Sequence, residues 1–504
     1  MAGDVNQLEK AATGISGLDN VLAGGLAREH VFLVEGQPGT GKTTIALSFV
    51  LEGARKGERC LYVTLSETER ELRAGAASHG WTIDDHIDVV ELAPAESLLD
   101  DSQQQSLLYS SDLELGETTR LIISAFERVR PSRVVLDSLS EIRLLAQSSL
   151  RYRRQILELK HYFARNSATV MLLDDMTSDV MDKTVHSVVH GVIQLEQATP
   201  AYGAERRRLR VAKYRGQAYR GGSHDFTIKT GGVAVFPRLV SAEHRADFVR
   251  TFVRSGIAEL DALLGGGVEQ GSSVLVLGPS GTGKSTIAIQ FLQAAVARGE
   301  KVAFFAFDEE LGLLFDRTRA IGMDLRGMRD KGLLHIEQVD AAELSPGEFA
   351  YRVRQSVQTV QAKIVLIDSL NGYQAAMPEE KYLALHIHEL LLYLNRQGVT
   401  SFLTVAQHGL IGEMATSVDV TYLADTVILL RYFEAFGKVR RAVSVIKKRT
   451  GKHEDTIREF RIDENGLTLG GPLIEFHGIL RGVPTHMGDA GRLLNPSSAG
   501  QTDS

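Results

Sequence analysis

The sequence lacks several features that would place it in other classes of protein. It has one cysteine, Cys60, in 504 residues, so no disulfide can form within the chain, which suits a reducing cytoplasm. No window approaches the ~18 uninterrupted apolar residues that a membrane-spanning helix needs. The first residues also lack the charged-then-apolar pattern of a secretory signal. We therefore expect a globular cytoplasmic protein with no membrane partner.

An excess of positive charge is also missing. The chain has 56 basic and 63 acidic residues, and its formal net charge is −7. Nucleic-acid-binding proteins usually carry a basic surface, so a nucleic-acid partner is disfavoured, although a local basic patch stays open. The run at 205–210 is rich in arginine, but a solvated or inter-subunit face explains it more simply.

One motif occurs twice. The residues at 36–43 and at 278–285 both fit the G-x-x-x-x-G-K-[ST] pattern of a phosphate-binding loop. Glycines let backbone N–H groups point at phosphate oxygens, the lysine reaches the β- and γ-phosphates, and the hydroxyl holds Mg²⁺. Each copy follows an apolar run and precedes a helical pattern, which is the context that the motif requires. The sequence therefore predicts two sites for ATP and Mg²⁺.

Each loop offers a set of backbone and side-chain groups to the nucleotide. In the first copy the predicted nucleotide-binding residues are Gly36, Gly39, Thr40, Gly41, Lys42, Thr43 and Thr44. In the second copy they are Gly278, Ser280, Gly281, Thr282, Gly283, Lys284, Ser285 and Thr286. Thr43 and Ser285 are the predicted Mg²⁺ ligands of the two loops.

The repeat extends beyond the loops. The lead-in segments at 13–26 and 255–268 match each other, and they keep the same offset of 242 residues that separates Lys42 from Lys284. Apolar strand patterns alternate with helical patterns in both copies. This alternation predicts an α/β fold in which each copy forms a doubly wound, mainly parallel sheet.

The duplication also predicts where the domains begin and end. A Ser- and Gln-rich stretch at 96–105 is expected to be an exposed loop of the first copy. The expected parts are a leader at 1–11, a first domain at 12–236, a linker at 237–250, a second domain at 251–481 and a flexible tail at 482–504.

Acidic residues occur where nucleotide hydrolysis needs them. Asp137 and Asp368 each end an apolar run downstream of a phosphate loop, a pattern typical of the carboxylate on the Mg²⁺ side. Hydrolysis also needs a carboxylate that orients and deprotonates water. The candidates are Glu67 in the first copy and Asp308 and Glu309 in the second, with Asp308 also a candidate metal ligand. An acid after a strand is often plain surface, but recurrence at one offset from both loops favours function.

Basic residues cluster near the end of each copy. Lys213 and Arg215 stand in the first copy, and Lys447 and Arg449 in the second. Arginine and lysine side chains that stabilise γ-phosphate charge are often supplied by a neighbouring subunit. A charged strand edge that discourages aggregation is an equally good explanation of these residues by spacing alone.

On these residues the chain resembles the KaiC family, the double-domain ATPases of the RecA-like group typified by the cyanobacterial clock protein. The resemblance covers about residues 12 to 485 and rests on the lead-ins, both loops, the acids after the next strand and both Asp-Ser-Leu strands. Its most specific stretches are at 213–216, 226–228, 457–460 and 476–480. It implies two tandem RecA-like P-loop NTPase domains.

The resemblance also implies an assembly and a division of labour. The family forms a homohexamer of two stacked rings, with ATP between subunits. The neighbouring subunit would contribute Lys213 and Arg215 in the first tier. In the second tier it would contribute Arg441, Lys447, Arg449 and His453. The first tier is chiefly an ATPase and the second an autokinase, for which Thr421 is the candidate acceptor here. KaiB-like or other signalling proteins are the implied partners.

The sequence departs from the family pattern at the acids and at the acceptors. Ser66 stands where the first acid of the first pair is expected, which leaves Glu67 as the only carboxylate of that pair. In the second pair Asp308 replaces a glutamate. Thr421 and Tyr422 replace adjacent serine and threonine acceptors, which disfavours a two-site phosphorylation cycle.

These observations predict a Mg²⁺-dependent ATPase with two unequal sites. The first site is expected to serve assembly and slow hydrolysis, and the second regulated chemistry. Two alternatives stay open: a RecA- or helicase-like DNA-dependent ATPase, because the core fold is shared, and a signalling scaffold switched by ATP.

Overall fold

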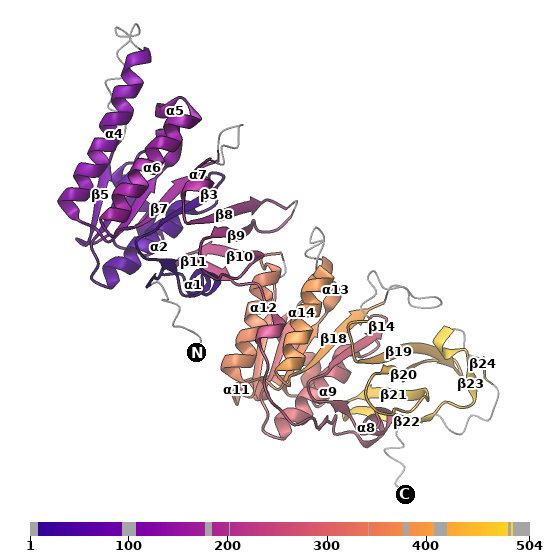
Figure 1. The fold of residues 1–504 in the computed structure, drawn as a ribbon. Helices are drawn as coiled ribbons and strands as arrows, with labels where there is room; N and C mark the ends of the chain where they lie inside the picture. Colours follow the sequence, from indigo (N-terminus) through magenta and orange to yellow (C-terminus); the bar gives the residue numbers. More distant parts are fainter. Residues whose placement is uncertain are drawn as a thin grey trace, which may run out of the picture. The chain divides into compact units, whose positions relative to one another are not determined.

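The structure is a computed structural model of the chain. It describes residues 9–92, 107–176, 184–200, 202–340, 342–375, 383–407, 421–481 and 485–486. The expected loop at 96–105 lies outside this part of the chain, as does almost all of the expected tail. The chain divides into two compact units, Met1–Arg238 and Leu239–Ser504 (Figure 1).

A nine-stranded sheet organises the described part of the first unit. Its order is β11-β10-β9-β8-β3-β7-β6-β4-β5. The segment from β5 to β8 is parallel, and β9, β10 and β11 extend it as antiparallel strands. The strands are β3 (Val31–Gly36), β4 (Cys60–Thr64), β5 (Ile87–Glu91), β6 (Arg133–Asp137), β7 (Thr169–Asp174), β8 (Gly191–Ala198), β9 (Arg206–Tyr214), β10 (Ser223–Lys229) and β11 (Gly232–Phe236).

The second unit repeats this topology. Its sheet order is β16-β15-β17-β18-β14-β19-β20-β21-β22, and again only the last three strands are antiparallel. The predicted doubly wound, mainly parallel α/β fold is confirmed in both units. The strands are β14 (Ser273–Gly278), β15 (Val302–Ala306), β16 (Leu334–Gln338), β17 (Ile364–Asp368), β18 (Thr400–Ala406), β19 (Thr426–Ala435), β20 (Lys438–Lys448), β21 (Arg458–Asp463) and β22 (Gly466–Pro472).

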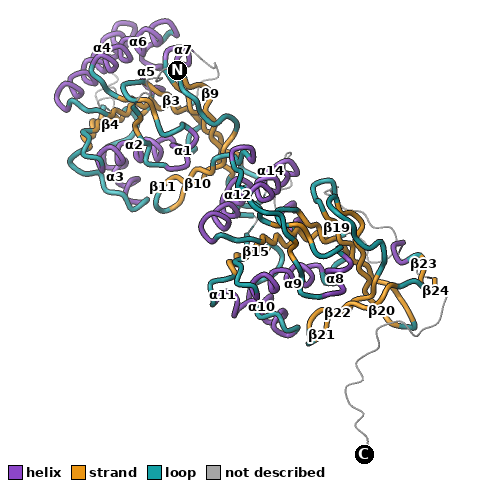
Figure 2. The backbone as a smooth tube through the Cα atoms, turned by 60° about the horizontal axis from the view of Figure 1, so that its bottom comes forward, coloured by secondary structure: helices purple, strands orange, loops and turns teal. Residues whose placement is uncertain are grey.

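Helices cover both faces of the first sheet (Figure 2). Alternate residues of a strand enter different cores, because successive side chains point to opposite faces. Phe32 and Val34 of β3 pack with α1, α2 and α3, whereas Val31 and Leu33 pack with α4 to α7. The helices are α1 (Ser16–Val21), α2 (Lys42–Arg55), α3 (Glu69–Ser78), α4 (Leu107–Val129), α5 (Leu139–Ala146), α6 (Ser149–Arg165) and α7 (Thr184–Val188).

The second unit is layered in the same way. One core lies under α8 to α11 and another under α12 to α14. Within the described ranges, no helix of either unit is both long and apolar enough to cross a bilayer. The helices are α8 (Ala258–Leu263), α9 (Lys284–Ala297), α10 (Leu311–Ala320), α11 (Leu325–Asp330), α12 (Pro346–Gln355), α13 (Leu370–Ala375) and α14 (Leu383–Arg396).

Short strand pairs flank the sheets. Strand β1 (Lys10–Ala11) pairs with β2 (Leu26–Ala27), so this strand lies before residue 12, the expected start of the first domain. The second unit has the equivalent pair β12 (Phe252–Val253) and β13 (Val268–Glu269). Near the other end, β23 (Phe476–His477) pairs with β24 (Thr485–His486).

Part of the segment expected as a linker packs onto the second unit. Leu239 is buried in the core that contains α14. A short 3₁₀ helix, η3 (Ser241–Glu243), follows, and Ala246 N donates to Arg396 O at 3.0 Å. These contacts tie residues from 239 to 246 to the second unit.

Candidate nucleotide-binding sites

The phosphate loops join β3 to α2 and β14 to α9. Gly41 and Gly283 precede the helices with φ angles of 98° and 103°, in the left-handed region that favours glycine. A Cβ at Gly41 would lie 2.3 Å from Ile228 Cδ1, and one at Gly283 would lie 2.5 Å from Ile462 Cδ1. These isoleucines come from β10 and β21, so the antiparallel extension of each sheet packs over its phosphate loop.

The loop lysines are buried and turn back onto the loops. Lys42 Nζ donates to Gly36 O at 2.9 Å and to Gln37 O at 3.0 Å. Lys284 Nζ donates to Pro279 O at 2.8 Å. Burial lowers the pKa of Lys284, and the nearby carboxylates of Asp368 and Asp308 act in the opposite direction. Each loop thus holds a positive charge against its own carbonyl oxygens, where phosphate oxygens would compete for it.

In the first unit the structure brings Asp137, the predicted carboxylate of the Mg²⁺ side, to the loop hydroxyl. Thr43 Oγ1 donates to Asp137 Oδ2 at 3.1 Å, and Tyr62 OH donates to the same oxygen at 2.7 Å. Burial raises the pKa of Asp137, and the two hydrogen bonds oppose that rise. The peptide bond that follows Asp137 is cis.

The second unit repeats this contact with a different supporting donor. Asp368 is half-buried and accepts hydrogen bonds from Ser285 and from Thr404. Burial raises its pKa as well, and the two hydrogen bonds lower it. Residue 304, which corresponds to Tyr62, is a phenylalanine, so the supporting hydroxyl comes from β18 instead of from the strand that corresponds to β4. Sequence reasoning had not anticipated this exchange.

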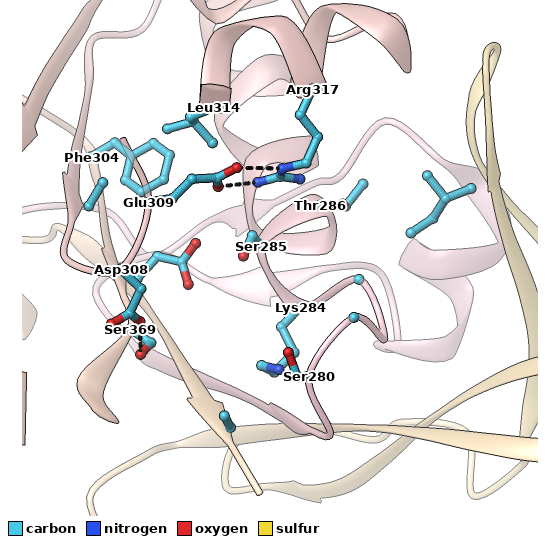
Figure 3. Close-up of a pocket in the computed structure, with 16 residues that line it drawn as sticks. Ser280, Lys284, Ser285, Thr286, Phe304, Asp308, Glu309, Leu314, Arg317 and Ser369 are labelled. Carbon is cyan, nitrogen blue, oxygen red and sulfur yellow. Dashed lines mark hydrogen bonds and ion pairs between the residues drawn. The ribbon is translucent and has the colours of Figure 1, made fainter. Parts of the chain in front are cut away.

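A cavity of about 420 Å³ opens beside the second loop. Lys284, Ser285, Asp308, Glu309 and Asp368 all line it, so the structure gathers the predicted loop and carboxylate residues around one space. In Figure 3, Asp308 and Glu309 lie on the strand side of this space, and Ser280 and Lys284 of the loop lie below it. Ser369 donates a hydrogen bond to the Asp308 carboxylate.

Sequence reasoning missed a cation in this cavity. Arg317 of α10 forms two hydrogen bonds with Glu309, Nε to Oε1 at 3.0 Å and Nη2 to Oε2 at 2.8 Å (Figure 3). The hydrogen bonds and charge of Glu309 raise the pKa of Arg317 against the effect of burial. The corresponding residue of the first unit is Gly75, 242 positions earlier. This difference is visible in the sequence, but only the packing of α10 shows that it matters.

Glu67 of the first unit is exposed and lies in a more negative environment. Partial desolvation raises its pKa, and the carboxylates of Asp137, Glu71 and Asp175 raise it further. A raised pKa suits a carboxylate that takes a proton from water. Its backbone is held by Thr64, whose Oγ1 accepts from Glu67 N at 3.0 Å.

Asp175 is a further carboxylate at the first loop, where the sequence had indicated only Glu67 as the catalytic acid and Asp137 on the Mg²⁺ side. Its Oδ1 lies 2.8 Å from Lys42 Nζ. It follows β7, the strand between β3 and β6. A polar residue after a buried strand at the carboxyl edge of a parallel sheet is a signal that could have identified it.

The predicted basic residues lie at the opposite edge of each sheet from the loops. Lys213 and Arg215 stand at the end of β9 and donate to backbone oxygens of residues 186, 187 and 189. Lys447 Nζ donates to Thr421 O at 2.9 Å and to Ala424 O at 2.8 Å, and Arg449 donates to Tyr422 O at 3.0 Å. The loops end β3 and β14, whereas these contacts lie beside the starts of β8 and β19.

Arg441 and His453 are placed differently from each other. Arg441 pairs with Tyr432 across β19 and β20 and lies over its ring, and the Tyr432 hydroxyl donates to Ser280 O at 3.4 Å. His453 follows β20 by several residues and is half-buried. Neither residue lines the cavity at the second loop, and neither do Lys447 and Arg449.

The candidate acceptor lies in the turn before β19. Thr421 and Tyr422 precede that strand, and the residues from 408 to 420 are not among those described. Because β19 runs parallel to β14, Thr421 lies at the start of the strand pair and the phosphate loop lies at its end. The six residues of β14 put roughly 17 Å between those edges.

A parallel sheet with a phosphate loop at its central strand, a buried aspartate on the loop hydroxyl and further carboxylates nearby define a RecA-like P-loop ATPase. The model of one family, described as "ATPase: KaiC", matches residues 11–240 and 253–473. The chain therefore belongs to the KaiC family of ATPases, as its motifs had indicated, and carries the ATPase domain of the family in two copies.

Curated relatives match over almost their whole length. The chain is 28% identical over 491 residues to "Circadian clock protein KaiC3" of Synechocystis sp., which covers 96% of each protein. It is 26% identical over 501 residues to "Circadian clock oscillator protein KaiC" of Acaryochloris marina, with 96% of this chain and 93% of the relative covered. The protein of the same name from Synechococcus elongatus is 26% identical over 495 residues, with 95% and 92% covered.

Proposed function

We propose that the protein is a Mg²⁺-dependent ATPase that works as a double-ring homohexamer, with each ATP site completed by the neighbouring subunit. The observation that carries this proposal is the separation of the two halves of each site. The loop and carboxylates lie at one edge of the sheet, and Lys213, Arg215, Lys447 and Arg449 lie at the other. In a ring, the second edge of one subunit can face the first edge of the next.

The residues at both loops fit Mg²⁺. Thr43 with Asp137, and Ser285 with Asp368, are hard oxygen donors in hydrogen-bond contact. Among the described residues, no group of three or more His, Cys, Asp or Glu side chains could hold a metal alone. Mg²⁺ at a phosphate loop needs few protein ligands because phosphates and waters supply the rest. When bound, it neutralises charge that develops on the phosphates.

Hydrolysis then follows from the remaining side chains. The loop lysine and backbone N–H groups hold the β- and γ-phosphates, and Glu67 or Glu309 accepts a proton from the attacking water. Cations from the neighbouring edge stabilise the charge of the γ-phosphate in the transition state. The carboxylates are needed for the hydrolysis step, whereas the loop lysines Lys42 and Lys284 are already needed to bind ATP.

A mixing experiment tests completion by the neighbour. One variant carries Glu67→Gln with Glu309→Gln, and the other replaces Lys213, Arg215, Lys447 and Arg449 by alanine. Each variant alone should turn over little ATP. Mixed rings should regain turnover wherever the intact carboxylates of the second variant face the intact cations of the first variant. Full turnover by the second variant alone would show that each chain completes its own sites.

A second experiment tests the ATPase itself. The Lys42→Ala, Lys284→Ala double variant should lose ATP binding and the hexamer, measured by equilibrium binding and light scattering. Turnover equal to that of the unchanged protein would exclude the proposal. Turnover that rises with single-stranded DNA and falls steeply with salt would favour a DNA-dependent ATPase instead.

We further propose autophosphorylation at Thr421 between subunits. Thr421 lies at the edge of the sheet that carries Lys447 and Arg449, and the length of β14, about 17 Å, separates that edge from the loop of the same chain. Incubation with γ-labelled ATP should label the peptide containing Thr421, and Thr421→Ala should abolish that label. Label absent under all conditions would exclude the kinase activity. We also propose a signalling or timing role, which the clock function in the names of the relatives supports; KaiB-like or other signalling proteins are the partners that the family resemblance implies.

A further inference from the structure

We propose that Asp175 provides the first ATP site with the water-positioning carboxylate that Ser66 cannot provide. This inference rests on the ATPase function proposed above. It concerns the carboxylate that works beside Glu67 in the first unit, where the sequence shows a serine in place of the first acid of the pair.

The second unit shows what this carboxylate contacts. Asp308 lies two residues after the end of β15, and its carboxylate accepts a hydrogen bond from Ser369. Ser369 comes immediately after Asp368, the aspartate of the Mg²⁺ side. The serine thus holds a second carboxylate beside the first, and both line the cavity at the loop.

The first unit makes the same contact with a carboxylate from another strand. Ser138, which comes immediately after Asp137, donates to Asp175 Oδ2 at 3.0 Å. Ser140 Oγ lies 3.4 Å from the same oxygen. Ser66, at the position of Asp308, is exposed and carries no charge.

The exchange between the units is reciprocal. Strand register aligns Asp175, after β7, with Ala406, at the end of β18, because Glu35 pairs with Asp174 and Leu277 pairs with Val405. Ala406 lines the cavity of the second site and offers no side-chain oxygen. In each unit, therefore, one carboxylate accepts a hydrogen bond from the serine that follows the Mg²⁺-side aspartate. This carboxylate follows β15 in the second unit and β7 in the first.

Asp175 is placed where it can act on the γ-phosphate side. Its Oδ1 is 2.8 Å from Lys42 Nζ, the atom that reaches the β- and γ-phosphates. Its charge is also felt by Asp137 and Glu67, whose pKa values it helps to raise. The side chain of Asp175 is 29% exposed to solvent, so water can reach it.

The step it serves is the attack of water on ATP. When Lys42 turns to the phosphates, Asp175 remains bound to Ser138 and Ser140 and accepts one hydrogen bond from the attacking water. The water oxygen forms a bond to the γ-phosphorus, and the bond from that phosphorus to the bridging oxygen breaks with its electron pair left on ADP. The second proton of the water passes to Glu67.

The test uses the full chain with Glu309→Gln, so that turnover reports the first site. That this turnover belongs to the first site is checked by adding Lys42→Ala, which must abolish it. Asp175→Asn should lower kcat about 10²-fold, the lower end for a positioned acid–base group, while the KM for ATP changes little. Adding Ser66→Asp to Asp175→Asn returns a carboxylate from the β4 side and should recover at least about tenfold of the loss.

The opposite results would overturn the inference. If Asp175 only neutralises Lys42 in the empty loop, Asp175→Asn should tighten ATP binding and leave kcat unchanged or higher. A loss of kcat that Ser66→Asp does not recover would assign Asp175 a structural role. The failure of the ATPase proposal itself would look different, because Lys42→Ala would then leave turnover intact.

Discussion

Single residues decide how the catalytic carboxylates of the two sites differ. Glu309 is held by two hydrogen bonds from Arg317, whereas Glu67 is exposed among other carboxylates and has a raised pKa. A base that is paired with arginine must leave that partner, or share it, before it accepts a proton from water. The second site is therefore restrained at its base, and the first site is not.

Arg317→Gln should release Glu309 and raise turnover at the second site. Charge-assisted hydrogen bonds contribute about 1.5–3 kcal/mol, so an increase of about tenfold in kcat is expected. The measurement uses a Glu67→Gln background. Arg319→Gln, on an exposed part of the same helix α10, is the matched control and should change nothing. A fall in kcat with Arg317→Gln would instead assign this arginine to the phosphates.

The raised pKa of Glu67 predicts a pH dependence of the first site. Glu67 must be ionised to accept a proton, and its pKa lies above the ordinary 4.5 because of desolvation and the charges of Asp137, Glu71 and Asp175. Turnover should thus fall as the pH drops through that raised pKa, which is above 4.5. The profile of kcat in a Glu309→Gln background measures it. An acid limb at or below 4.5 would contradict the assignment.

At the scale of elements, the antiparallel extension of each sheet closes over the phosphate loop. Ile228 of β10 and Ile462 of β21 occupy the space beside Gly41 and Gly283. The parallel strands carry the charged groups, and the extension limits what the loop can contain. This function of β10 and β21 explains why the loop needs glycine for space as well as for its φ angle.

Gly41→Ala should abolish ATP binding at the first site. The added Cβ would clash with Ile228. The alanine would also have to adopt a φ of 98°, which costs about 1–2 kcal/mol for an L-residue. Adding Ile228→Ala removes the clash but not the strain, so binding should return only in part. Gly57→Ala, after the other end of α2, has φ +77° and an open surrounding. It should lower stability without affecting binding, measured with a fluorescent ATP analogue; equal binding losses would contradict the steric argument.

At the scale of the whole molecule, the two units share a topology but not their internal cross-links. Arg133, at the start of β6, is fully buried and donates to Glu58 Oε2 at 2.7 Å, to Ala12 O at 2.7 Å and to Phe49 O at 2.8 Å. The lead-in, α2 and two strand ends are joined through this one guanidinium. The second unit has Ile364 at the corresponding position.

Glu58→Gln should therefore destabilise the first unit alone, by about 3 kcal/mol, because it leaves Arg133 buried with a weakened partner. Hydrogen exchange, measured peptide by peptide, should become faster in residues 9–238 and should not change in the second unit. Equal effects on both units, or no effect, would contradict this account.

The same ion pair predicts acid sensitivity. Burial alone would raise the pKa of Glu58, but hydrogen bonds from Arg133 and Arg28 lower it from 4.5 to about 2. The stabilisation is thus fully present above pH 4.5 and is lost as the pH falls toward 2. The free energy of unfolding of the first unit, measured against pH, should fall over this range. In the Glu58→Gln variant this dependence on pH should be absent.

The sequence alone determined the parts of this protein that are encoded locally. Both phosphate loops, the strand–helix alternation and the aspartates that end β6 and β17 follow from short patterns and from their recurrence. The tertiary structure decided which distant residues complete each site. Asp175 reaches Lys42 because β7 lies between β3 and β6, and Arg317 reaches Glu309 because α10 packs beside the second loop. Such contacts depend on strand order and helix packing, which no local pattern specifies.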